Sequence, residues 1–100
     1  MLDLSSLKKE HFTVKTQSGD IFELNPPKIK VLRKAEELSS STGEKSFEDL
    51  ACAVATILSG NKTGKKVTEK YVEDNLDIDD INLLLKEYFK WITRVRKNPN

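Results

Sequence analysis

The chain has 100 residues, of which 37% are hydrophobic and 33% are charged, and its formal net charge is +1. This length fits one domain with a single modest core. The near-neutral charge excludes the strongly basic or acidic character that predicts contact with nucleic acid or a membrane surface. Cys52 is the only cysteine, which excludes an intramolecular disulfide, and we expect its side chain to be buried as a small hydrophobic group.

Residues 1–10 are polar and mixed, and they are predicted to form a flexible N-terminal segment. They contain no apolar stretch long enough for a signal peptide. No run in the chain approaches the length of about 20 apolar residues that a membrane span needs. We therefore expect a cytoplasmic protein.

Residues 11–24 are predicted to form a β-hairpin. Phe12, Val14 and Thr16 alternate with polar residues, and a second apolar run follows at Ile21–Leu24. The segment between the runs contains Gly19, which tolerates the positive φ of a tight turn. Because a two-stranded hairpin is only marginally stable alone, we expect it to pack on the helices that follow.

Two helices are predicted next, at about 28–40 and 46–59. Pro26 ends the second strand, and Pro27 has the fixed φ that suits a helix start. Ser46 is a suitable cap for the second helix, which is apolar on more than one face and is therefore expected at the centre. The Ser/Thr/Gly run at 39–43 ends the first helix. Its expected apolar stripe is Ile29, Leu32, Ala35 and Leu38, with Val31 adjacent.

The last two helices are predicted at 68–75 and 78–96, with a tail at 97–100. Thr68 and Asp77 are placed to cap them, and Val67 and Val72 have the spacing of a hydrophobic staple. The sequence therefore predicts a single α+β domain over 11–96, mostly helical, with an N-terminal β-hairpin followed by about four α-helices. The expected apolar stripe of the final helix is Ile81, Leu84, Leu85, Tyr88, Ile92 and Val95.

No catalytic, cofactor or metal motif is complete in the chain. The loop Gly60–Lys66 has three residues between its glycines where a phosphate-binding loop has four, and it follows a helix instead of a strand. The acidic run from Asp77 lacks the glycine and glutamate of a calcium-binding EF-hand loop. His11 is the only histidine. These patterns favour a non-enzymatic protein without a cofactor or metal.

Three aromatic residues lie close together on the final helix, and they allow two interpretations. In the first, Tyr88 belongs to the core while Phe89 and Trp91 fill the side that faces the hairpin. In the second, Phe89 or Trp91 lies at an interface with a partner protein, where aromatic residues are favoured. The candidate partner-binding residues are Phe89, Trp91, Lys62, Lys65 and Lys66.

Residues 13–92 resemble the tail assembly chaperones of tailed bacteriophages and prophages. The similar stretches are the Pro-Pro-Lys opening at Pro26–Lys28, the turn Ile57–Lys62 and the ending Tyr88–Ile92. The resemblance implies a non-enzymatic protein of the host bacterial cytoplasm that binds the tape measure protein and helps to recruit the tail tube protein. Such proteins are absent from the mature virion. Several self-associate, and many carry a frameshift-encoded extension.

A small helix-turn-helix-like DNA-binding domain is the alternative, built from the helices at 67–75 and 78–96. Arg94, Arg96, Lys97 and the lysines of the Gly60–Lys66 loop would then contact phosphates. The acidic start of the second helix, at Asp77 and Asp79, opposes this interpretation because it would meet the phosphates with like charge.

Overall fold

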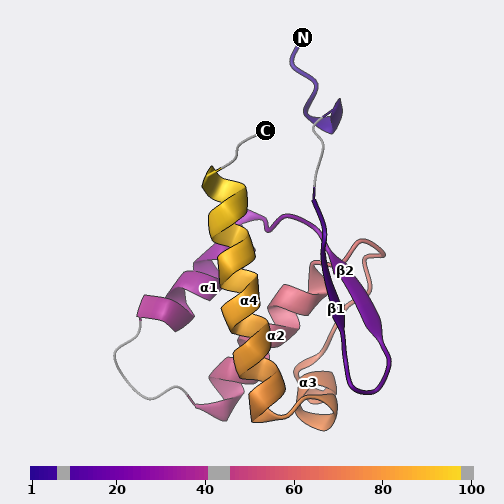
Figure 1. The fold of residues 1–100 in the computed structure, drawn as a ribbon, viewed down its shortest axis with the longest axis vertical. Coiled ribbons are helices and arrows are strands. Elements are labelled where there is room, and N and C mark those ends of the chain that lie inside the picture. The colour runs from indigo at the N-terminus through magenta and orange to yellow at the C-terminus, as the bar shows by residue number, and fades with distance from the viewer. Residues whose placement is uncertain (7–9, 41–45, 98–100) are drawn as a thin grey trace.

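The structure is a computed structural model, and it describes residues 1–6, 10–40 and 46–97 (Figure 1). Within these ranges it confirms the expected α+β class, an N-terminal hairpin followed by four helices. Of the run at 39–43 that was expected to end the first helix, residues 41–43 lie outside the described residues, and of the tail predicted at 97–100, residues 98–100 do. The elements are η1 (Leu4–Ser6), β1 (Phe12–Lys15), β2 (Ile21–Leu24), α1 (Ile29–Ser40), α2 (Phe47–Ser59), α3 (Glu69–Asn75) and α4 (Ile78–Lys97).

The hairpin pairs β1 and β2 in an antiparallel register, with Phe12 opposite Leu24 and Val14 opposite Phe22. Its turn closes with a hydrogen bond of 2.9 Å from the Thr16 N–H to the Asp20 carbonyl. Gly19 adopts a φ of +96°, as expected for this turn. The paired apolar residues share one face of the ribbon, and that face packs against the helices.

Helix α2 forms the centre of the molecule, as the sequence predicted. Ser46 caps it, since the Ser46 Oγ accepts a hydrogen bond of 3.1 Å from the Asp49 N–H. Figure 1 shows α4 crossing in front of α2, with the hairpin on one side and α1 on the other. The buried residues of α2 are Ala51, Ala53, Val54, Ala55, Ile57 and Leu58.

Helix α4 begins with a reciprocal cap, which confirms the predicted role of Asp77. The Asp80 N–H donates to Asp77 Oδ1 at 2.8 Å, and the Asp77 N–H donates to Asp80 Oδ2 at 3.0 Å. The second bond is the main cause of a lowered pKa for the Asp80 carboxyl. None of the helices in the described ranges is both long and apolar enough to cross a membrane.

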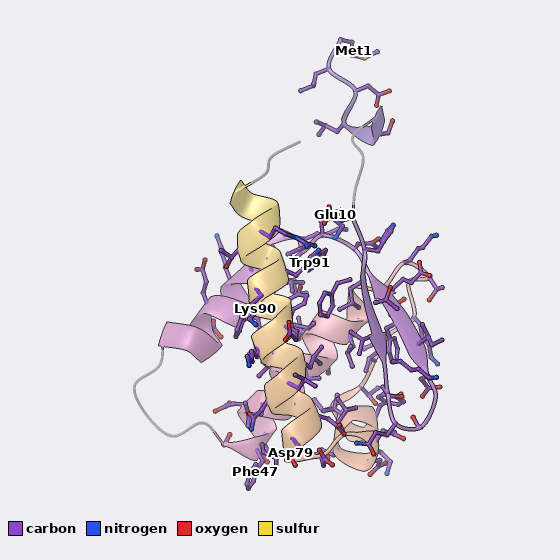
Figure 2. All side chains as sticks on the ribbon, in the orientation of Figure 1. Met1, Glu10, Phe47, Asp79, Lys90 and Trp91 are labelled. Atoms are coloured by element: carbon purple, nitrogen blue, oxygen red, sulfur yellow. The ribbon has the colours of Figure 1, made fainter. Side chains whose placement is uncertain are left out.

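An aromatic cluster joins β1 to α4. The Phe12 ring lies 5.8 Å from the Tyr88 ring and 5.4 Å from the Trp91 ring, measured between centroids. Burial raises the pKa of the Tyr88 phenol to about 12. Trp91 is only 4% exposed, and Figure 2 shows it between α4 and the hairpin. Trp91 therefore fills the side of α4 that faces the hairpin, as in the first interpretation, and does not lie at a partner interface as in the second.

The apolar stripe of α1 also differs from the prediction. Ile29 is 69% exposed, whereas Ala35 is buried and Val31 and Leu32 pack against the core. The helix begins one residue later than expected, and the carbonyl of Lys28 accepts its first bonds. At about 100° per residue, Ile29 lies more than a quarter turn from the centre of the buried stripe. The side chain of Leu38 is outside the described part.

We expect Trp91→Ala to lower the free energy of unfolding by about 3 to 5 kcal/mol, because it opens a cavity between α4 and the hairpin. Urea unfolding followed by circular dichroism measures the change. Leu83→Ala is the control on the same helix, since Leu83 is 60% exposed, and it should change stability by less than about 0.5 kcal/mol. Equal effects of the two substitutions would contradict the buried position of Trp91.

Candidate functional site

The loop between α2 and α3 is held in one shape by the buried side chain of Asn61. Its amide Nδ2 donates to the carbonyl of Leu58 at 2.8 Å and to that of Lys65 at 2.7 Å. Its Oδ1 accepts from the Thr63 hydroxyl at 2.8 Å and from the Lys65 N–H at 2.9 Å. Gly64 completes the loop with a φ of +74°. All the polar atoms of this side chain are therefore hydrogen bonded, as burial requires.

The same loop is joined to the sheet beside β2. The Asn25 N–H donates to the Gly60 carbonyl at 2.9 Å, and the Lys62 N–H donates to the Glu23 carbonyl at 2.7 Å. The Lys62 side chain also lies 3.8 Å from the Glu23 carboxylate. The loop therefore pairs with the end of β2 through two backbone hydrogen bonds, which also fix the position of the loop relative to α2.

The final residues of the loop are tied back to α2 by Ser59. The Ser59 Oγ accepts from the Val67 N–H at 2.9 Å and donates to the Ala55 carbonyl at 2.7 Å. Thr68 then caps α3, because its side chain accepts from the Tyr71 N–H. Val67 and Val72 are both buried, which agrees with the expected hydrophobic staple. The segment leading into α3 is therefore held against α2.

A groove of about 730 Å³ results, and we call it the α2 groove. Its floor is the half-exposed side of α2. One wall is the segment that leads into α1 together with the first turn of that helix, and the other wall is the segment that leads into α3 together with its first residue. The floor residues are Cys52, Ala55, Thr56 and Ser59. The first wall includes Pro26, Pro27, Lys28, Lys30 and Val31. The second wall includes Gly64, Lys66, Val67, Thr68 and Glu69.

The walls of the α2 groove are mainly positive. Lys28, Lys30 and Lys66 are exposed, and Glu69 is the single acidic residue among the lining residues. Elsewhere, Lys70 pairs with Asp74 at 3.5 Å. Among the described residues, no ion pair joins Lys28, Lys30 or Lys66 to a carboxylate. Their charges are therefore available to a ligand with acidic groups.

The structure separates the five residues that the sequence singled out for partner binding. Lys66 lines the α2 groove, whereas Lys62 and Lys65 line a different hollow of about 480 Å³ beside β2. Trp91 is in the core, and Phe89 is half-buried and packed against it. One of the five therefore lies at the groove, and no single surface contains the set.

Most groove residues were missed by sequence reasoning. The floor had a detectable signal, because Cys52, Thr56 and Ser59 have the spacing of one helix face. Cys52 itself is half-buried instead of fully buried. Lys66 was among the predicted partner-binding residues, whereas Lys28 and Lys30 had no signal in the sequence, because only the fold places them at the same groove as Lys66.

The described residues contain no group of three or more His, Cys, Asp or Glu side chains arranged to hold a metal ion. Comparisons with protein-family models, with curated proteins and with solved structures found no match to this chain. The α2 groove and its charges therefore carry the functional proposal.

Asn61→Ala should lower the free energy of unfolding by about 2 to 3 kcal/mol, because it leaves buried partners without hydrogen bonds. Amide hydrogen exchange at Lys65 should accelerate at the same time, since its N–H loses Asn61 Oδ1. Asn25→Ala is the matched control, because the Asn25 side chain is exposed. Unchanged exchange at Lys65 in Asn61→Ala would contradict the loop-organising role.

Proposed function

We propose that this chain is a non-enzymatic assembly chaperone that binds a helical segment of another protein in the α2 groove. The observation that carries the proposal is the groove itself: a mixed apolar and polar floor from α2, between walls that bear lysines. In helix-in-groove binding the apolar face of a helix lies on the apolar part of a groove, and polar groups at the margins fix its orientation.

The charges favour a bound helix that is acidic along its flanks. Lys28 and Lys30 lie on one wall and Lys66 on the other, so carboxylates on either side of an apolar stripe would meet a lysine. Exposed charges of this kind act mainly on the association rate and on the choice of partner. They are screened by salt over about 8 Å at physiological ionic strength. Binding should therefore weaken as the salt concentration rises.

The resemblance to phage tail assembly chaperones supplies a specific partner, the tape measure protein, with the tail tube protein as a further one. A tape measure protein is a long helical chain whose apolar faces need cover before the tube surrounds it. A groove that covers one apolar helix face suits that role. On this proposal the protein acts in the host bacterial cytoplasm and is absent from the finished particle.

The DNA-binding alternative gains no support from the fold. Its recognition helix would be α4, whose Ile81, Leu84 and Tyr88 belong to the core. The exposed start of α4 carries Asp77 and Asp79, which would repel phosphates. The alternative stays a prediction, and duplex binding at low salt is its test.

The experiment is co-expression with a tape measure protein, the partner that the resemblance implies, followed by affinity capture and light scattering. We expect a soluble complex of defined mass. In a triple variant, Lys28→Glu, Lys30→Glu and Lys66→Glu, we expect the affinity to fall by at least about tenfold, because each wall then repels an acidic helix.

The matched control reverses three exposed lysines outside the groove, Lys70→Glu, Lys86→Glu and Lys90→Glu. It makes the same change in net charge and should keep most of the affinity. If the groove variant still captures the partner and the control variant does not, the partner binds elsewhere than in the α2 groove. Failure to form any complex would reject the tape measure protein as the partner.

A further inference from the structure

The outer edge of β1 carries unpaired backbone groups. The sheet contains β1 and β2, and the bridge to Asn61 is on the β2 side. The Thr16 N–H donates to the Asp20 carbonyl across the hairpin. Because backbone groups of an antiparallel strand point alternately toward and away from its partner, the N–H and C=O groups of Val14 and Phe12 also point toward β2. The N–H and C=O groups of Thr13 and Lys15 therefore point outward, and no described strand pairs with them.

A small hollow of about 190 Å³ lies beside this edge, between β1 and α4. Val14, Leu76 and Leu83 give it an apolar lining, and Leu83 is 60% exposed. A hollow of about 150 Å³ accepts benzene, so this one has room for a leucine side chain. The hydrogen bond of 2.9 Å from Gln17 Nε2 to Asp80 Oδ1 lies at the end nearer the turn.

Three of the first four residues are apolar and exposed to solvent. Met1, Leu2 and Leu4 are 119%, 84% and 64% exposed. Figures 1 and 2 show this segment, residues 1–6, reaching away from the body of the molecule. We call it the arm. Leu2 and Leu4 alternate with Asp3 and Ser5, which is the pattern of a strand with one apolar face.

We propose that the arm of one copy adds as a strand to the outer edge of β1 in a second copy, and that the exchange is reciprocal. A free strand edge is the usual template for such strand addition. The pairing makes a symmetric dimer in which each copy supplies the same two surfaces. Because the arm reaches away from the hairpin of its own chain, we assign the edge to the arm of a second copy.

The two surfaces match in periodicity and in charge. Side chains of Thr13 and Lys15 are on the solvent face of β1, and those of Phe12 and Val14 are on the inner face beside the hollow. With Asp3 opposite Lys15, the alternation places its carboxylate beside the Lys15 ammonium. Leu2 and Leu4 then fall on the inner face, where the hollow lies.

The arm must give up a short turn to pair. Its η1 turn has three residues, and beside it the Ser5 N–H and hydroxyl donate to Asp3 Oδ1 at 3.0 and 2.5 Å. These bonds are exposed to solvent. The strand that replaces the turn gains backbone bonds with Thr13 and Lys15 and covers the two leucines.

Sedimentation equilibrium of the full chain over micromolar to millimolar concentration is the test, and we expect a monomer–dimer equilibrium. The arm variant Leu2→Ser with Leu4→Ser should weaken dimerisation by at least about tenfold, because two leucines lose their cover. Thr13→Pro should weaken it similarly, since proline removes an outward N–H while the bonds to β2 remain. Ile21→Ser is the control, an exposed sheet residue away from the edge.

Carbodiimide coupling of isotope-mixed chains gives a second measurement that does not depend on the variants folding. It should join Asp3 of one chain to Lys15 of the other, because a carboxylate and an amine in contact form an amide. A monomer at every concentration would overturn the proposal. So would a dimer that both variants leave intact, or an Asp3–Lys15 link found only within single chains, which would place the arm on its own β1.

Discussion

The fold and the groove both depend on the buried Asn61 side chain. Its four hydrogen bonds fix the loop after α2, and that loop pairs with β2 and then lies along α2. A hairpin of two short strands is marginal without further contacts. Here the loop supports one strand and the aromatic cluster of Phe12, Tyr88 and Trp91 supports the other. The α2 groove is the space left between this fixed loop and the segment entering α1.

Features set by neighbouring residues were predictable from the sequence. The caps at Ser46, Thr68 and Asp77 each involve a residue three positions away, and the structure has all of them. The hairpin turn follows from Gly19, which takes the positive φ. These signals are local, because cap and turn chemistry lie within one turn of backbone. They give the element order and the fold class.

Features set by tertiary packing were less predictable. The sequence left Trp91 between the hairpin side of α4 and a partner interface, and only its packing against Phe12 decides for the hairpin side. Ile29 was expected in the core, but it lies on the exposed side of α1. The candidate site shows the same limit. Lys28 and Lys66 face one groove only because the Asn61 loop and the Pro-Pro segment flank α2, and no spacing in the sequence reports that approach.

The central claim is that a protein partner occupies the α2 groove, and Cys52 on its floor reports this directly. Thiol reactivity depends on access, and Cys52 is the only cysteine. In the complex with the long helical partner, alkylation of Cys52 should fall to a small fraction of its rate in the free protein. A cysteine at exposed Asp79, in a Cys52→Ser background, should react equally in both states. An unchanged Cys52 rate in a complex of verified mass would contradict the account.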